Sequence, residues 1–417
     1  MRILVVGKGG REHALIRALV ESPGSPEVYC FPGSEAIHEL AKPVPVDGLE
    51  ALVAWMSGNA VDLCVAGEES YLVKGAGLAN LCAAAGIPCW GPPKESAQLE
   101  ASKEFAKGFL QRHGIPTARA SACATYAEAV AAIAGYYPTV LKFDGLAAGK
   151  GVAVCQDEAA AQAFLAEVFT ERRFGDGRVL VEDCLTGPEV SVFAAIVDGE
   201  YMVFTPARDY KRIGEGDTGP NTGGMGAVAS RNLVSPDLMR QIEDLIVAPT
   251  VAGLRQDGLP YRGFLYFGLM LTPEGPQVIE YNCRFGDPEC QAVMPLVHGD
   301  LAGFCLAGAQ GVLRADLLTF DEGWSVCVIL ASAGYPETAR SGDRISGLEA
   351  AAPARVYHAG TRKSADGGWE TNGGRVLAVV SGAPTLATAV ANTHACADRI
   401  GFAGLQRRRD IGILHFT

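Results

Sequence analysis

Three polar side chains with alternating spacing late in the chain offer the clearest candidate chemistry. Glu280, Asn282 and Arg284 follow a short apolar run that predicts a buried strand. Alternate side chains of a strand share one face, so these three project together unless a bulge intervenes. A carboxylate and an amide oxygen suit Mg²⁺ held with substrate phosphates, and a guanidinium suits carboxylate or phosphate oxygens. The alternative is a surface strand with scattered polar residues. Gly286 and Pro288 favour a binding site, because they end the strand and leave its polar face at an edge or mouth.

A glycine-rich turn, Gly7–His13, joins the first predicted strand to the first predicted helix. Such a turn lets the backbone approach a phosphate at the helix N-terminus. It is not the dinucleotide fingerprint, because the third glycine position falls on Glu12. A plain tight turn is an equal alternative, although the polar side chains of Arg11 and Glu12 favour a ligand. We interpret His13 as structural.

A second glycine-rich loop, Asp144–Gly151, follows a predicted strand that ends near Lys142. It is not a P-loop, because Asp144 occupies the first glycine position and Gly151 replaces the Ser or Thr that holds Mg²⁺. Its backbone N–H groups and Lys150 could still close over a triphosphate. A solvent-exposed hairpin turn is the equal alternative from this loop alone.

Composition excludes several classes of protein. The 417 residues carry a net charge of −12, which disfavours non-specific binding to nucleic acid or anionic membranes. None of the 12 cysteines forms a Cys-x-x-Cys pair, so we interpret most of them as small core hydrophobes in a reducing compartment. The first residues are typical of a strand rather than of a signal peptide. The sequence has no run of 18 apolar residues, so no membrane span is predicted. We expect a cytoplasmic protein.

The order of the predicted elements divides the chain. Residues 1 to about 90 alternate strands and helices, which predicts an open parallel sheet with ligands beyond the carboxyl ends of its strands. Gly91–Lys94 marks a linker, and one helix is predicted over 96–113. The long polar segment 209–226 is interpreted as a functional loop rather than a disordered one. Later elements are a helix near 236–253, a hairpin over 264–282 and a compact α+β region from about 323.

Five segments spread along nearly the whole chain form one specific set: Gly7–Ala14, Lys142–Val152, Asp217–Ala227, Glu280–Glu289 and Thr371–Val376. Together and in this order they resemble the ATP-grasp ligases and, within them, the phosphoribosylamine–glycine ligase family (glycinamide ribonucleotide synthetases). The set is far more specific than any one segment.

The resemblance implies an α/β and α+β multidomain fold. Residues 1–95 would form a Rossmann-like substrate domain with an open parallel sheet. Residues 96–320 would form the ATP-grasp domain with a mobile lid at about 120–188, and residues 321–417 a small α+β domain. The implied reaction belongs to de novo purine biosynthesis. ATP phosphorylates glycine to glycyl phosphate, which the amine of 5-phosphoribosylamine attacks to give glycinamide ribonucleotide, ADP and phosphate. The resemblance also implies Mg²⁺ or Mn²⁺ as the metal cofactor, ATP as co-substrate and no covalent enzyme intermediate. It implies no nucleic-acid or membrane partner, and a monomer or weak dimer.

The resemblance also assigns roles to the matching positions. The metal ligands are Glu280 and Asn282, and the catalytic residues are Arg284, Lys142 and Asp209. The ATP-binding residues are Lys103, Lys142, Gly149, Lys150, Gly151, Glu182, Leu185 and Glu189, with Glu182 to Leu185 as the adenine hinge and Glu189 as the ribose acceptor. The substrate-binding residues are Gly9, Gly10, Arg11, Glu12, Glu69, Lys211 and Arg284.

Four departures from the family pattern keep alternatives open. Ser34 replaces Asn, Glu68 and Tyr71 replace the prolines of a Gly-Pro-Glu-x-Pro-Leu loop, Lys8 replaces Asn, and Phe143 replaces a small residue. The first three lie in the implied phosphoribosylamine pocket, so an ATP-grasp ligase with another amine nucleophile is the first alternative. A nucleotide-binding regulator without turnover is disfavoured by the intact ligand row. A nicotinamide-dependent oxidoreductase is disfavoured by the incomplete glycine fingerprint.

Overall fold

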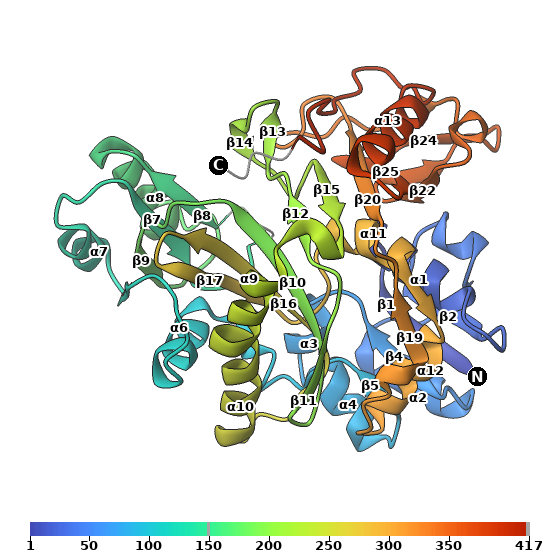
Figure 1. Ribbon diagram of the computed structural model, residues 1–417, viewed down its shortest axis with the longest axis horizontal. Coiled ribbons are helices and arrows are strands. Elements are labelled where there is room, and N and C mark those ends of the chain that lie inside the picture. Colours follow the sequence, from blue (N-terminus) through green and yellow to red (C-terminus); the bar gives the residue numbers. More distant parts are fainter. Residues whose placement is uncertain (148–150, 414–417) are drawn as a thin grey trace.

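The computed structural model describes residues 1–147 and 151–413 (Figure 1). Its first part is a sheet of five parallel strands in the order β3-β2-β1-β4-β5, which confirms the predicted open parallel sheet. The elements are β1 (Arg2–Gly7), α1 (Gly10–Val20), β2 (Glu27–Pro32), β3 (Lys42–Pro43), α2 (Leu49–Gly58), β4 (Leu63–Ala66), α3 (Ser70–Val73), α4 (Leu78–Ala84) and β5 (Cys89–Trp90).

The largest sheet is antiparallel and continues into the C-terminal part of the chain. Its order is β17-β16-β10-β12-β15-β20-β25-β22, with β11 paired to β10. Its strands are β10 (Glu189–Val197), β11 (Glu200–Val203), β12 (Ala207–Asp209), β15 (Gly226–Ala229), β16 (Arg262–Thr272), β17 (Gly275–Asn282), β20 (Trp324–Ala331), β22 (Arg355–His358) and β25 (Arg375–Ala383). The pairing of β15 with β20 makes the C-terminal strands part of the sheet that carries β17. The sequence predicts these strands but not their junction, because partners so far apart leave no local pattern.

A third, four-stranded sheet lies at the left of Figure 1, in the order β6-β9-β7-β8. Its side chains form a hydrophobic cluster of their own, with Leu141, Leu165 and Val179 among the buried members. A segment with its own core can move as a unit. Its elements are β6 (Ala120–Cys123), α7 (Tyr126–Ile133), β7 (Thr139–Phe143), β8 (Val152–Cys155), α8 (Glu158–Phe169) and β9 (Val179–Asp183).

The single helix predicted over 96–113 is wrong, because the structure has α5 (Gln98–Ala101) and α6 (Lys103–Arg112) instead. The backbone of Ser102 is extended, and its Oγ accepts the N–H of Phe105 at 3.0 Å. A serine that caps the following helix satisfies an otherwise unpaired N–H group. Helix α6 therefore begins at Lys103, whose ammonium group interacts electrostatically with Glu280 on the late strand.

Two other segments also contain more structure than predicted. The polar loop 209–226 includes a small ribbon, and the helix near 236–253 contains a π-helical stretch at Glu243–Val247. The elements are β13 (Arg212–Gly214), β14 (Thr218–Asn221), α9 (Pro236–Ile242) and α10 (Ala248–Gln256).

The hairpin β16–β17 carries the predicted row of polar side chains. Its pairing shifts at Ile279, where one extra residue forms a bulge just before the row begins. Beyond the bulge Glu280, Asn282 and Arg284 are half-buried, whereas the residues between them are buried. The three side chains therefore share a face, as the strand pattern predicts.

The remaining elements complete the C-terminal part. They are α11 (Glu289–Val293), β18 (Val297–Gly299), α12 (Leu301–Ala309), β19 (Leu318–Phe320), β21 (Arg344–Ile345), β23 (Thr361–Lys363), β24 (Trp369–Thr371) and α13 (Leu386–Ala397). Within residues 1–147 and 151–413, no helix has the length and apolar character needed to cross a bilayer.

Candidate active site

The carboxylate of Glu280 lies where cations from three elements converge. Lys103 from α6, Lys142 from β7 and Lys211 after β12 all act on it electrostatically. Burial alone would raise the pKa of Glu280, but these ammonium groups outweigh burial and lower it. An ionised carboxylate with the amide of Asn282 on the same face is a donor set that fits a hard divalent cation bound together with phosphates.

Two buried lysines, Lys107 and Lys142, share the buried carboxylate of Glu182 beside this row, and we refer to the two lysines as the lysine pair. Lys142 Nζ lies 2.9 Å from Glu182 Oε2 and donates to the carbonyl oxygen of Ile279 at 2.9 Å. Lys107 Nζ lies 3.3 Å from Glu182 Oε1, and burial lowers the pKa of Lys107. Two ammonium groups and one carboxylate leave this corner with excess positive charge. Because the lysines occupy the Glu182 side chain, a ligand contact at Glu182 itself falls to its backbone.

The predicted phosphate loop is described only at its two ends, because Gly149 and Lys150 lie outside the described residues. Before the gap, Lys103 Nζ donates to the carbonyl oxygen of Gly145 at 2.8 Å. After the gap, a Cβ atom added to Gly151 would lie 2.7 Å from the Cβ of Ala147, which explains the glycine.

Phe143, one of the departures from the family pattern, packs into the core of the third sheet. Its ring lies 5.3 Å from that of Phe174. Side chains at Gly145 or Gly177 would collide with this ring, so glycines make the room that the larger residue needs. The departure therefore changes packing beside Lys142 without adding a polar group to the site.

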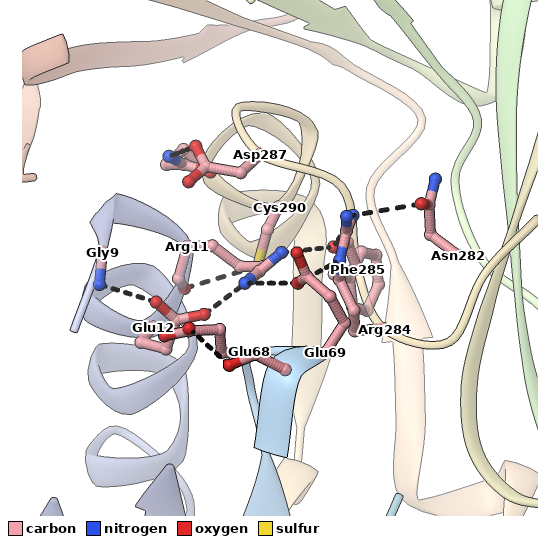
Figure 2. Close-up of polar contacts among 12 residues, drawn as sticks. Gly9, Arg11, Glu12, Glu68, Glu69, Asn282, Arg284, Phe285, Asp287 and Cys290 are labelled. Carbon is pink, nitrogen blue, oxygen red and sulfur yellow. Dashed lines mark hydrogen bonds and ion pairs between the residues drawn. The ribbon is translucent and has the colours of Figure 1, made fainter. Parts of the chain in front are cut away.

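At the N-terminal turn, the Glu12 carboxylate is committed to the turn itself. It accepts the N–H of Gly9 and the Nε–H of Arg11, each at 2.6 Å (Figure 2). Side chains at Gly7 or Gly67 would collide with Glu12, which is only 2% exposed. Ligand contacts at this turn therefore fall to the backbone and to the outer face of the Arg11 guanidinium.

Arg284 connects the late strand to the N-terminal sheet through direct ion pairs, and we refer to Arg11, Glu69, Glu100 and Arg284 as the junction network. Arg284 Nε lies 3.0 Å from Glu69 Oε2, and its Nη2 lies 2.8 Å from Glu100 Oε1. Arg11 Nη2 lies 3.5 Å from Glu69 Oε2. Figure 2 shows Arg11, Glu69 and Arg284 converging, with Arg284 also donating to Asn282 Oδ1 at 3.3 Å.

The two carboxylates of the junction network titrate in opposite directions. Burial raises the pKa of Glu100 to about 7, although Arg284 acts against this shift. Burial would also raise the pKa of Glu69, but Arg284 and Arg11 outweigh it and lower that pKa to about 2. Sequence reasoning missed Glu100, because a lone glutamate on a short helix carries no signal of the arginine that it faces.

Asp209 is the acidic residue of a second buried cluster. Among the described residues no hydrogen-bond partner reaches its Oδ1, which is shielded from solvent. Burial and the neighbouring carboxylate of Glu289 raise the pKa of Asp209 well above its ordinary value. Ser191 Oγ donates to Glu289 Oε1 at 2.9 Å. Glu289, which the sequence analysis did not single out as a site residue, thus adds to the effect of burial on the pKa of Asp209.

Lys211, the cationic residue of the same loop, forms an ion pair with Glu189, a predicted ATP-binding residue. Its Nζ lies 2.7 Å from Glu189 Oε2. The structure thus places Lys211 between Glu189 and Glu280, which the sequence analysis assigned to different ligands. A ligand hydroxyl that binds Glu189 would have to share that carboxylate with Lys211.

Two other departures, Ser34 and Tyr71, and the residue His13 make local structural contacts. Ser34 Oγ accepts the N–H of Ile37 at 3.4 Å, and the ring of Tyr71 packs edge-on against Phe31 at 6.1 Å. His13 is buried, and its Nδ1 accepts the backbone N–H of His358 at 3.0 Å. This contact joins α1 to the C-terminal strand β22 and confirms the structural interpretation of His13.

Family models match almost the entire chain. The N domain, the ATP-grasp (A) domain and the C domain of phosphoribosylglycinamide synthetase match residues 1–100, 101–290 and 325–414. Among its relatives, the phosphoribosylamine–glycine ligase of Chlorobaculum tepidum is 42% identical over 425 residues and covers 99% of each chain.

Solved structures give the same result. The crystal structure of phosphoribosylamine–glycine ligase from Thermotoga maritima matches with a TM-score of 0.85 and 32% identity, over 99% of this chain and 100% of that one. The biotin carboxylase domain of a Hydrogenobacter thermophilus 2-oxoglutarate carboxylase matches with a TM-score of 0.73 over 97% of this chain and 91% of that one. At 18% identity the second likeness concerns the ATP-grasp fold alone.

Proposed function

The chain belongs to the phosphoribosylglycinamide synthetase family, and we propose that it joins glycine to 5-phosphoribosylamine at the expense of ATP. The products are glycinamide ribonucleotide, ADP and phosphate, in a cytoplasmic step of purine biosynthesis. The observation that supports this proposal most is the full-length match to all three family domains in a chain whose row Glu280, Asn282 and Arg284 is intact.

The proposed reaction has two steps. A carboxylate oxygen of glycine attacks the γ-phosphorus of ATP, ADP leaves, and glycyl phosphate forms. The amine of phosphoribosylamine then attacks the glycyl carbonyl carbon, phosphate leaves, and the nitrogen loses a proton. In such a phosphoryl transfer the protein mainly positions the reactants and neutralises charge.

On the nucleotide side, Glu280 and Asn282 would hold Mg²⁺ or Mn²⁺, which when bound would neutralise charge on the phosphates. Lys142 and Lys103 supply further positive charge next to Glu280. The loop with Gly149, Lys150 and Gly151 would cover the phosphates, the backbone of Glu182 to Leu185 would contact adenine, and Glu189 would accept a ribose hydroxyl. The third sheet, at about 120–188, would close over the nucleotide and exclude water.

On the substrate side, Arg284 would hold the carboxylate of glycine or the acyl phosphate formed from it. Asp209, whose pKa burial and Glu289 raise, would exchange a proton with the amine. The turn with Gly9, Gly10, Arg11 and Glu12, together with Glu69 and Lys211, would form the phosphoribosylamine side. We also propose that the chain forms three domains, residues 1–95, 96–320 and 321–417, and that the protein is a monomer or a weak dimer.

The decisive experiment measures ADP release by the purified enzyme with Mg²⁺. We expect ADP to form only when ATP, glycine and phosphoribosylamine are all present, with glycinamide ribonucleotide identified by mass spectrometry. Turnover with a different primary amine and none with phosphoribosylamine would replace this proposal by another ATP-grasp ligase. ATP binding with no turnover for any amine would replace it by a nucleotide-binding regulator.

A further inference from the structure

Three cysteines from separate elements of the N-terminal sheet form one cluster. Cys64 lies on β4, Cys89 on β5 and Cys82 on α4, elements that lie together at the lower edge of Figure 1. Cys64 and Cys89 are partners in parallel register, so their side chains leave the sheet on the same face. The three sulfur atoms lie within 4.8 Å of one another, and all three thiols are free. Within residues 1–147 and 151–413, this is the only His, Cys, Asp or Glu group of three or more that is close enough to hold a metal ion.

We propose that Cys64, Cys82 and Cys89 bind one thiophilic divalent cation, such as Zn²⁺, as three thiolates. A Zn–S bond of about 2.3 Å with tetrahedral angles places two ligand sulfurs about 3.8 Å apart. Sulfurs already within 4.8 Å of one another need to approach by only about 1 Å to reach this geometry. Binding releases three protons, one from each thiol, and forms three metal–sulfur bonds with no change in oxidation state.

A cluster of thiols differs from the isolated cysteines elsewhere in the protein. Cys305 on α12 is a buried thiol among apolar side chains, where cysteine acts as a small hydrophobe. In the cluster, by contrast, three sulfur donors lie within 4.8 Å of one another, so one ion can contact all three.

The surroundings of the cluster provide an entry path and a selectivity. Cys64 and Cys82 are buried, but Cys89 is only half-buried, so an ion can enter past Cys89 and keep a water molecule as a fourth ligand on that side. The donors are soft sulfur atoms, whereas Glu280 and Asn282 offer hard oxygen atoms. The two sites therefore prefer different metals and can be distinguished in one preparation.

Metal binding would tie β4, α4 and β5 together. An ion that binds the folded protein and not the unfolded chain stabilises the fold in proportion to the logarithm of its concentration. We expect the melting temperature of the reduced enzyme to rise with added Zn²⁺. The effect is independent of ATP, glycine and the proposed ligase reaction.

The first test uses Cd²⁺ as the probe, titrated into the reduced full-length enzyme. Three thiolates bound to Cd²⁺ give an ultraviolet charge-transfer band that oxygen ligands do not give. We expect the band to saturate at one equivalent and to disappear when Zn²⁺ is added in excess. Cys89→Ser, which alters the most exposed ligand, should weaken Cd²⁺ binding by at least about tenfold. Cys305→Ser, at a buried cysteine outside the cluster, should leave the titration unchanged.

A second test needs no variant and so does not depend on the folding of Cys89→Ser. X-ray absorption of the native enzyme with one equivalent of Zn²⁺ should show three sulfur neighbours at about 2.3 Å. A first shell without sulfur, or a Cd²⁺ titration of Cys89→Ser that matches the native one, would overturn the proposal. A native enzyme that gives no charge-transfer band would overturn it as well.

Discussion

The junction network and the lysine pair differ in how buried charges are arranged. In the network two carboxylates, Glu69 and Glu100, flank the guanidinium of Arg284, whereas in the lysine pair two ammonium groups flank the carboxylate of Glu182. Buried charges in excess of their partners are costly in either sign. Beside Arg284, burial raises the pKa of Glu100 to about 7, which reduces the negative charge in the network. The lysine pair has two ammonium groups for one carboxylate, and an anionic ligand such as a triphosphate would balance the second.

This difference indicates what each region contributes. The junction network joins the N-terminal sheet to the late strand and is largely satisfied within the protein. The region around the lysine pair and Glu280 gathers cations whose charge exceeds that of the nearby carboxylates. Variants in the first region should therefore lower stability, and at Arg284 turnover as well, whereas variants in the second should act mainly on turnover.

The largest expected effect is in the network. Arg284→Met leaves Glu100 without its ion-pair partner and Glu69 with Arg11 alone, which should cost about 3–5 kcal/mol of unfolding free energy because removing one partner of a buried ion pair is strongly unfavourable. Urea unfolding measures the change. Adding Glu100→Gln to this variant removes the orphaned charge of Glu100 and should restore part of the loss. A double variant no more stable than Arg284→Met would argue against charge balance as the cause.

On the nucleotide side, Glu280→Ala should lower turnover by about a hundredfold to a thousandfold while the fold survives, since it removes a proposed metal ligand from the transition state. ADP release at saturating Mg²⁺ and circular dichroism measure the two effects. Glu274→Ala, at an exposed position in the turn of the same hairpin, is the matched control and should behave like the native enzyme. Near-normal turnover of Glu280→Ala would remove the metal assignment.

The pH dependence of stability tests the raised pKa of Glu100. An unfolded glutamate has a pKa of 4.5, and the folded value is about 7. As the pH rises from 4.5 to about 7, the unfolded chain releases this proton first. The free energy of unfolding should therefore fall, by about 3 kcal/mol from this group. Glu100→Gln should remove the fall, and Glu50→Gln on the exposed face of α2 should keep it. Identical slopes in all three proteins would show that Glu100 does not hold the proton.

The smallest expected effect is at Lys142. In Lys142→Met, Glu182 keeps its ion pair with Lys107, so stability should change little, by about 1 kcal/mol. The loss of one positive charge beside Glu280 should instead lower kcat/KM for ATP by about tenfold or more. A loss of stability comparable to that of Arg284→Met, with kcat/KM unchanged, would reverse the contrast between the two regions.

Local patterns predicted the parts of the protein that depend on local chemistry. The alternation of strands and helices predicted the N-terminal parallel sheet, and the spacing of Glu280, Asn282 and Arg284 placed them on one face. The break at Ser102 could have been foreseen as an N-cap signal, but the apolar spacing around it suggested a continuous helix. The functional roles of these residues stay predictions until they are tested by turnover.

The sequence by itself determined which donors exist and which side chains share a strand face, because both follow from residue type and from a backbone period of two. Only the tertiary structure decided the partners: Glu100 against Arg284, Glu289 beside Asp209, two lysines on Glu182, and three cysteines from β4, α4 and β5 in one cluster. Electrostatic and thiol interactions act over a few ångströms in space, and distance along the chain carries no record of them.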